Sequence, residues 1–320
     1  MTREARDWRP SASLETIRER AALYGAVRSF FAQRNVLEVE TPILSAAATV
    51  DRHIDSFRVD DRWLQTSPEF AMKRLLAAGS GAIYQIARVF RRDEQGRHHN
   101  PEFTMLEWYR PGFDHHALMD ELAALLAACG VPGAVTRLSY REAFEAHAGF
   151  DPHRVDAAAL RERWLARGLS AIESLSATEQ ADADLWLDLW MSHVVGPQLG
   201  ADAPQFLYDF PATQAALSRV RPGNPPLAER FELFWRGIEL ANGFHELTDA
   251  AEQQRRFIAD QQVRQSAGRE VPPYDEPLIA ALSHGLPACA GVAVGLDRVL
   301  MLKLGRSSLE SVLAFAADRA

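Results

Sequence analysis

Hydrophobic positions near the start of the chain recur at helical spacing. Apolar side chains at 14, 17, 21, 23, 27, 30 and 31 fall largely on one face, which predicts a helix from Ser13 to about residue 34. Ser13 suits the cap of this helix and Asn35 its end. Residues 36–45 are expected to form a strand interrupted at Pro42, and residues 69–78 a second helix that Gly79 ends.

The next segment alternates apolar and polar residues. Residues 82–94 and 101–110 are rich in β-branched and aromatic side chains, and the polar stretch 95–100 separates them. Strand, polar loop and strand in this order predict a β-hairpin.

Helical and extended patterns alternate through the rest of the chain. Helices are expected at 117–129, within the Ala-rich stretch 135–200 and at 249–267. A strand is expected at 205–211, and residues 229–247 are expected to form either a pair of strands joined through Gly237 or one long bent strand. Residues 291–305 are expected to form a strand that enters a helix. Since no linker or repeat divides the chain, we expect a single domain, residues 1–320, with a helical insertion at about 112–200.

Composition and charge narrow the classes of protein. The 320 residues are 47% hydrophobic and 24% charged, with a net charge of −8 that disfavours an obligate nucleic-acid binder. Cys129 and Cys289 are far apart, which argues against a disulfide framework or a zinc site. The charged N-terminal residues do not resemble a signal peptide, and no run of about 20 apolar residues occurs. We expect a cytoplasmic protein without a membrane segment.

Two arginines stand where a phosphate could be bound. Arg91 lies at the end of the first hairpin strand, where its guanidinium could clamp a phosphate, and Phe103 on the return strand could offer a face to a purine. Arg298 follows Gly291 and Gly295 at the start of a helix, a position that favours anions. A surface arginine and close strand packing are the alternative explanations, and no GxxxxGK[ST] phosphate loop is present.

Three glutamates lie seven residues apart. Glu232, Glu239 and Glu246 would alternate faces in one straight strand, so a turn or bulge near Gly237 or Gly243 is needed to bring them together. If they converge, their oxygens suit Mg²⁺ bound together with phosphates. Solvated glutamates on an exposed strand are the alternative.

These elements occur in the order found in class II aminoacyl-tRNA synthetases. Residues 34–44 resemble motif 1 of that family, FRRDEQGRHHNPEF resembles motif 2, and GVAVGLDRVLM resembles motif 3. TSPEFAMKRLL and GIELANGFHELTDA resemble the lysyl branch, and especially its truncated members, which are ligases that modify elongation factor P. The resemblance implies an α+β fold, a mainly antiparallel sheet flanked by helices, and a homodimer formed through motif 1. Because about 35 residues precede motif 1, we expect no anticodon-binding domain.

The resemblance also assigns roles to individual residues. Arg91 and Arg298 would be the catalytic residues. ATP would be bound by Arg91, Arg92, Asp93, His99, Asn100, Phe103, Glu239, Leu240, Gly295 and Arg298. The amino acid would be bound by Ser67, Pro68, Glu69, Tyr109, Asn242, Glu246 and Ala293, and Mg²⁺ by Glu232 and Glu239.

Two positions depart from the family pattern. Asp93 stands where motif 2 usually has glutamate, so the carboxylate is one methylene shorter and its contact with the nucleotide can be rearranged. Ala293 stands where lysyl-tRNA synthetases normally have glycine. Its Cβ would reshape the floor of the amino-acid site, which is a route to selecting a β-amino acid.

The implied reaction is the ATP-dependent activation of (R)-β-lysine or lysine as an adenylate, followed by transfer to a lysine side chain of elongation factor P. No stable tRNA binding is expected. One alternative is a ligase of the same type that charges tRNA or a small amine with lysine. A second alternative is an inactive paralogue that acts as a binding module, but that reading predicts a broken motif arginine or lost carboxylates, and neither is seen.

Overall fold

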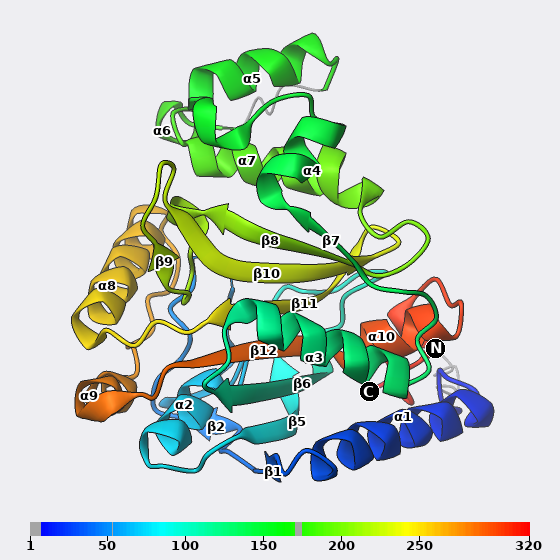
Figure 1. The fold of residues 1–320 in the computed structure, drawn as a ribbon. Helices are drawn as coiled ribbons and strands as arrows, with labels where there is room; N and C mark the ends of the chain where they lie inside the picture. The colour runs from blue at the N-terminus through cyan, green and yellow to red at the C-terminus, as the bar shows by residue number, and fades with distance from the viewer. Residues whose placement is uncertain (1–7, 53, 170–174) are drawn as a thin grey trace, which may run out of the picture. The chain divides into compact units, whose positions relative to one another are not determined.

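The computed structural model describes residues 8–52, 54–169 and 175–320, and the chain divides into two compact units. The first unit comprises residues up to Val131 together with Glu246–Ala320, and the second comprises Pro132–His245. Each unit has strands and helices of its own (Figure 1).

The first unit carries long helices around a central sheet. Its helices are α1 (Leu14–Ala32), α2 (Glu69–Ala77), α3 (His115–Ala128), α8 (Ala250–Ser266), α9 (Glu276–Gly285) and α10 (Leu296–Lys303). Its strands are β1 (Leu37–Glu38), β2 (Leu44–Ser45), β3 (Arg58–Val59), β4 (Arg62–Leu64), β5 (Ile83–Phe90), β6 (Glu102–Pro111) and β12 (Cys289–Gly295). The main strand order is β1-β5-β6-β12, and β2, β4 and β3 form a separate small sheet.

The register of the main sheet gives it one apolar face. Tyr84 on β5 pairs with Trp108 on β6, and Trp108 pairs with Val292 on β12, so the three side chains point the same way. Phe31 of α1 stacks on Tyr84 with ring centroids 4.4 Å apart. Helix α3 packs against α1 and β12. These helices therefore bury the apolar face.

The opposite face combines small and polar residues. Tyr109, Glu107 and Met105 on β6 pair with Gly291, Ala293 and Gly295 on β12. Because directly opposed residues share a face, the three small residues of β12 lie beside the longer side chains of β6.

The second unit joins four main strands to a group of short helices. Its strands are β7 (Thr136–Ser139), β8 (Gln205–Pro211), β9 (Val220–Arg221), β10 (Leu227–Trp235) and β11 (Ile238–His245). Its α-helices are α4 (Tyr140–His147), α5 (Ala157–Ala166), α6 (Ala177–Gln180) and α7 (Ala183–Trp190). The strand order is β11-β10-β8-β7, with β9 on β10, and only the β7–β8 pair is parallel among these described strands.

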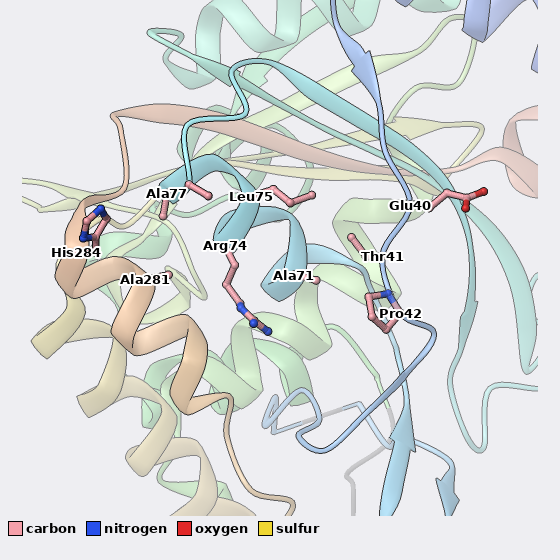
Figure 2. Close-up of a pocket in the computed structure, with 10 residues that line it drawn as sticks. Glu40, Thr41, Pro42, Ala71, Arg74, Leu75, Ala77, Ala281 and His284 are labelled. Carbon is pink, nitrogen blue, oxygen red and sulfur yellow. The ribbon is translucent and has the colours of Figure 1, made fainter.

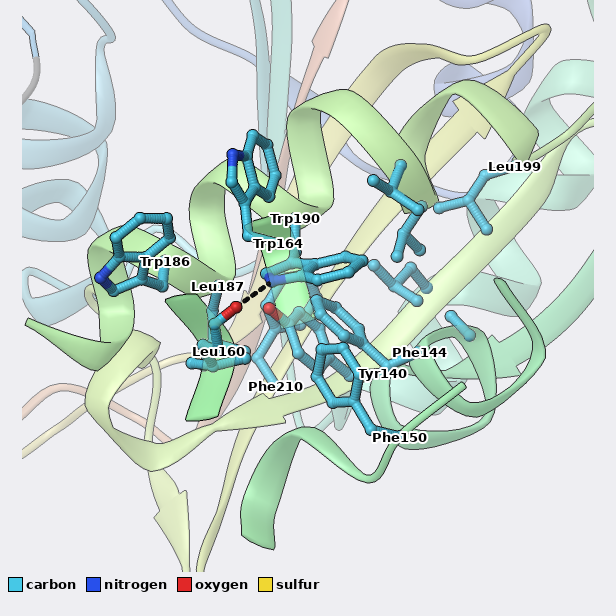
Figure 3. Packing of buried hydrophobic residues seen from close by; sticks show 14 of the residues in the cluster. Tyr140, Phe144, Phe150, Leu160, Trp164, Trp186, Leu187, Trp190, Leu199 and Phe210 are labelled. Atoms are coloured by element: carbon cyan, nitrogen blue, oxygen red, sulfur yellow. Dashed lines mark hydrogen bonds between the residues drawn. The ribbon is translucent and has the colours of Figure 1, made fainter. Parts of the chain in front are cut away.

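An aromatic cluster forms the core of the second unit (Figure 3). The indole of Trp190 contacts the ring of Trp164 at 5.6 Å and donates a hydrogen bond to the carbonyl of Leu160 at 3.3 Å. Phe150 approaches Trp190 edge-on at 5.1 Å. Trp164, Trp186 and Trp190 are buried and pack the helical segment.

Most predicted elements are present. Ser13 caps α1 by accepting a hydrogen bond from the Thr16 amide, and Asn35 adopts a φ of 52° just beyond the end of this helix. The predicted hairpin is β5–β6 with antiparallel register, and β10 and β11 are joined at Gly237. The predicted α+β fold with a mainly antiparallel sheet is confirmed.

Two local features were not predicted. Strand β7 lies inside the stretch expected to be helical, and the end of α7 continues as a π-helical turn at Met191–Val195. The proline at 197, directly after Gly196, cannot donate a helical hydrogen bond, which ends the regular helix there. Among the described residues, no helix has both the length and the apolar character needed to cross a bilayer.

Candidate functional site

A buried ionic cluster lies between α2 and the sheet of the first unit. Lys73 extends its ammonium group to Glu69 Oε1 and to Glu246 Oε2, each at 2.6 Å. Glu107 accepts hydrogen bonds from Tyr109 OH and from Ser67 Oγ, also at 2.6 Å each. We call Glu69, Lys73, Glu107, Tyr109 and Glu246 the carboxylate pocket.

Burial and mutual repulsion shift the titration of this pocket. Burial raises the pKa of Glu107 to about 7, and neighbouring Glu69 adds to the rise. Burial raises the pKa of Glu246 to about 8, although Lys73 opposes the rise. Burial alone would lower the pKa of Lys73, but Glu246 and Glu69 more than offset it, so the ammonium group stays charged. The pocket therefore holds more carboxylates than cations, and a further positive charge would stabilise the ionised form of these carboxylates.

The loop before α2 holds the open end of the pocket. Ser67 Oγ accepts a hydrogen bond from the backbone amide of Glu69 at 3.0 Å while donating to Glu107. Pro68 occupies the cap position of α2 without a side-chain cap. Ser67 therefore couples the start of α2 to β6, and the predicted residues Ser67, Glu69, Tyr109 and Glu246 are brought together.

Neighbouring side chains pack directly against the backbone of Gly291. A Cβ at this position would overlap the Tyr109 ring and lie 2.5 Å from Glu246 Oε1. Ala293, two residues on, pairs with Glu107 and packs against the small cluster of Ala87, Val89 and Met105. Glycine at 291 is thus needed for the close approach of Tyr109 and Glu246 to β12.

The two predicted catalytic arginines are near one histidine. Arg298 donates from Nε to the carbonyl of His98 at 3.2 Å. Burial lowers the pKa of His99, and the positive charges of Arg298 and Arg91 lower it further. Both guanidinium groups are therefore close enough to His99 to affect its charge.

The hairpin positions Arg91 beside an aromatic ring. Its guanidinium lies 5.2 Å from the centroid of Phe103, and its Nη1 is 3.5 Å from Glu94 Oε1. Arg91 Nε is buried and has no hydrogen-bond partner among the described residues. An anion would supply the missing acceptor.

The other hairpin residues have defined local roles. Asn100 donates from Nδ2 to the carbonyl of Glu102 at 2.6 Å and accepts from the Ala317 amide at 3.1 Å. Arg92 Nε is 3.5 Å from Asp93 Oδ2, and the Asp93 side chain is 78% exposed. Asn100 thus shapes the loop, while Asp93 points largely into solvent.

The carboxylates of the second unit converge through a bulge. Glu232 pairs with Asn242 across β10 and β11, and the register shifts so that Leu240 is skipped before Glu239 pairs with Phe234. The extra residue places Glu239 on the face of Glu232. Burial raises the pKa of Glu232 to about 8; the neighbouring cation of Arg230 opposes the rise and Glu239 adds to it. The predicted bulge is therefore present, at Leu240 between Gly237 and Gly243, and it brings Glu239 to the side of Glu232, whereas Glu246 pairs with Lys73.

Arg230 occupies one side of this acidic pair. Its Nη2 contacts Glu232 Oε1 at 2.5 Å and its Nε donates to Asn242 Oδ1 at 3.2 Å. The guanidinium also lies over the ring of Phe210 at 4.4 Å. A second carboxylate beside the buried Glu232 fits a divalent cation.

Sequence reasoning missed Lys73, Glu107 and Asp297. Asp297 Oδ2 accepts a hydrogen bond from the Thr104 amide at 2.7 Å, and Oδ1 pairs with Arg20 at 2.5 Å. This ties the start of α10, and with it Arg298, to β6 and α1. Lys73 lies four residues after Glu69, and a charged residue at 107 interrupts an apolar strand; both were available as signals.

A separate cavity of about 570 Å³ lies on the other side of α2 (Figure 2). It is lined by Glu40, Thr41, Pro42, Ala71, Arg74, Leu75, Ala77, Ala78, Ala281 and His284. None of the predicted site residues lines this cavity. Its walls are α2, α9 and the segment after β1, so it is distinct from the carboxylate pocket.

Comparison with known proteins agrees with this geometry. The family model for class II tRNA synthetases (D, K and N) matches residues 1–319. A Vibrio cholerae protein named elongation factor P–(R)-β-lysine ligase is 49% identical over 98% of this chain and 99% of its own length. Proteins of the same name from Yersinia enterocolitica and Salmonella gallinarum are 48% and 47% identical, each over 99% of both chains. The chain therefore belongs to the class II tRNA synthetase family of the D, K and N type.

Proposed function

We propose that the chain is a ligase that activates (R)-β-lysine or lysine with ATP and transfers it to a lysine side chain of elongation factor P. The observation that carries this proposal is the carboxylate pocket. Glu69, Glu107 and Glu246 lie around the single cation Lys73, so the pocket attracts a substrate with more than one ammonium group. The printed names of near full-length relatives support the same substrate and acceptor.

The amino acid binds along the face that carries Gly291 and Ala293. Glu246 and Tyr109 receive the side-chain ammonium, and Ser67, Pro68 and Glu69 line the amino-acid site, with Glu69 near the other amino group of the substrate. Asn242 completes the proposed set. The unpartnered Glu246 Oε1 supports its role, because a buried carboxylate oxygen gains most from a charged donor.

ATP binds through the hairpin and the start of α10. Arg91 contacts the α-phosphate, Arg298 the γ-phosphate, and Phe103 stacks on adenine, while Gly295 gives room for the nucleotide. The remaining contacts come from Arg92, Asp93, His99, Asn100, Glu239 and Leu240. The buried, unpartnered Nε of Arg91 supports an anion at this point.

Glu232 and Glu239 hold Mg²⁺. When bound, the ion neutralises phosphate charge. The raised pKa of Glu232 supports the assignment, because two close carboxylates share a site more readily when a cation lies between them.

The reaction has two steps. A carboxylate oxygen of the amino acid attacks the α-phosphorus, a new O–P bond forms, and the bond to the β-phosphate breaks and releases pyrophosphate. The acceptor amine then attacks the carbonyl carbon, an amide bond forms, AMP leaves with the bonding electrons, and the amine loses its proton to solvent. Arg91 and Arg298 stabilise the charge that develops on the phosphates.

The enzyme acts in the cytoplasm as a homodimer without stable tRNA binding. The exposed apolar side chains of Leu37, Ile43 and Leu44, on either side of Pro42, support a subunit interface at motif 1. Sedimentation equilibrium tests the dimer; a monomer at micromolar concentration would contradict it.

A panel of ATP–pyrophosphate exchange reactions tests the activation step. Exchange is measured with lysine, (R)-β-lysine and (S)-β-lysine, and with alanine as the control without a second ammonium group. We expect exchange that depends on a lysine-type amino acid. Equal exchange with alanine would show that the carboxylate pocket does not select the substrate.

A further inference from the structure

Lysine is rare in this chain. Of its 35 basic residues other than histidine, only Lys73 and Lys303 are lysines, and all others are arginines. Lys303 is partly exposed and lies 3.6 Å from Glu19. Lys73 is 2% exposed, although burying an isolated ammonium group is unfavourable. A chain that otherwise uses arginine therefore keeps a lysine at one buried position inside its proposed substrate pocket.

The geometry at Lys73 fits an ammonium group and not a guanidinium. The 2.6 Å contacts to Glu69 Oε1 and Glu246 Oε2 reach two carboxylates from different parts of the chain. An ammonium is a compact charge with three donors, whereas the planar fork of arginine favours one carboxylate with two parallel bonds. Lys73 thus links Glu69, in the first turn of α2, to Glu246, the residue that directly follows the second unit in sequence.

The charge of the pocket is not balanced by Lys73 alone. Three carboxylates against one ammonium leave two negative charges when all groups are ionised. Glu246 Oε1 has no donor among the described residues and lies close to the backbone of Gly291, beside the Tyr109 ring. The uncompensated charge therefore lies at the face of β12 that carries Gly291.

We propose that Lys73 is a positioning residue that fixes Glu69 and Glu246 and cancels one of the three carboxylate charges, so that the pocket selects an amino acid with two ammonium groups. This inference rests on the proposed function, and it identifies Lys73 as the residue that sets which class of amino acid the pocket accepts. Lys73 itself makes no contact with the reacting atoms in this account. It acts through the two glutamates.

Two neutral variants and one conservative variant test the proposal. Lys73→Met removes the charge and both contacts, Lys73→Gln removes the charge but keeps N–H donors, and Lys73→Arg keeps the charge. Lys303→Met is the matched control, because it removes the other lysine outside the pocket. Thermal unfolding shows which variants fold, and pyrophosphate exchange with (R)-β-lysine and lysine is measured from pH 6 to pH 9.

The neutral variants should raise KM for the amino acid by about 100-fold at pH 7 and leave KM for ATP within about twofold. Without Lys73 the glutamates hold their protons more tightly, so exchange should recover at higher pH than in the wild type. Lys73→Arg should keep the pH profile of the wild type with a raised KM, and Lys303→Met should match the wild type.

The outcomes separate this proposal from the one on which it rests. Wild-type exchange together with an unshifted pH profile in a folded neutral variant would overturn the role of Lys73 alone. Equal rises in KM for ATP and for the amino acid would do the same, because they indicate a general loss of structure. No wild-type exchange with any lysine-type amino acid would overturn the proposed function and this inference with it.

Discussion

The two units bury different kinds of side chain. The first unit encloses Lys73 with three carboxylates, and burial raises the pKa values of two of them, Glu107 and Glu246. The second unit encloses indole and phenyl rings, with Trp190 at 1% exposure among Trp164, Trp186 and Phe150. Burial of rings stabilises a fold, whereas burial of charges costs free energy unless each is paired.

Because the two units bury different kinds of side chain, we expect substitutions in them to affect stability and activity to different degrees. Replacing all members of a buried ionic cluster together by well-packed apolar groups is often harmless to stability, so such a cluster is kept for another reason. An aromatic cluster has the opposite character, because its loss leaves a cavity. Variants in the first unit should therefore change catalysis more than stability, and variants in the second unit should do the reverse.

The largest effect is expected at Arg298. Arg298→Ala removes a cation from the proposed phosphate site and should lower pyrophosphate exchange by about 10³-fold or more, because charge on the phosphates is then poorly stabilised. The melting temperature should stay close to that of the wild type. Arg306→Ala, an exposed arginine after the same helix, is the control. Exchange at the wild-type rate in Arg298→Ala would remove this residue from the site.

Trp190→Ala should have the largest effect on stability. Removing this buried indole should lower the free energy of unfolding by about 3–5 kcal/mol, measured by urea denaturation. Leu165→Ala, on the exposed side of α5, should change it by less than about 0.5 kcal/mol. The exchange rate per folded molecule should be unchanged. Lower activity with normal stability would break the contrast between the units.

Glu246→Gln should weaken amino-acid binding with little change in stability. The substitution keeps the shape and removes the charge that receives the substrate ammonium, so KM for the amino acid should rise about 100-fold. KM for ATP should not change. The exposed Glu310→Gln serves as the control. A loss of stability as large as that of Trp190→Ala would show that Glu246 is mainly a structural residue.

The smallest effect expected is a pair of opposite pH trends. The pKa values of Glu107 and Glu246 are raised to about 7 and about 8 from an ordinary value of 4.5. From pH 4.5 up to these raised values, the folded chain therefore binds more protons than the unfolded chain. Their contribution to stability is therefore present at low pH and is lost as pH rises through 7 to 8.

Amino-acid binding should follow the reverse trend. Ammonium groups favour ionised carboxylates, so KM for the amino acid should fall by about tenfold between pH 6 and pH 8. Thermal unfolding without substrate and exchange kinetics across the same range measure the two trends. A KM that is constant over this range would mean that the carboxylates are already ionised.

The hairpin and the order of elements could be predicted because their signals are local. Ser13 caps its helix with its own hydroxyl group. The hairpin positions of Arg91 and Phe103 could be predicted because alternating strand patterns lie on either side of a polar loop. The need for a turn or bulge near Gly237 or Gly243 also followed from the spacing of the glutamates. Its position at Leu240 did not, because a bulge is set by the pairing of two strands.

The carboxylate pocket could be predicted only in part. Glu246 and Glu69 are 177 positions apart in the sequence, and only the fold brings both to Lys73. Glu107 lies within a strand of apolar residues. Its role in the pocket can be recognised only once β6 is paired with the strand that carries Gly291 and Ala293. Strand β7 was missed because its four residues lie beside helical patterns, and its pairing with β8 overrides local preference.

The most direct test of the account offers two acceptors to one activated amino acid. The chain is incubated with ATP, Mg²⁺ and labelled (R)-β-lysine, and elongation factor P and lysine tRNA are present at equal concentration. We expect label on elongation factor P, with a mass increase of one lysyl residue, and none on tRNA. Label on tRNA alone, or no formation of AMP with either acceptor, would contradict the proposed ligase activity.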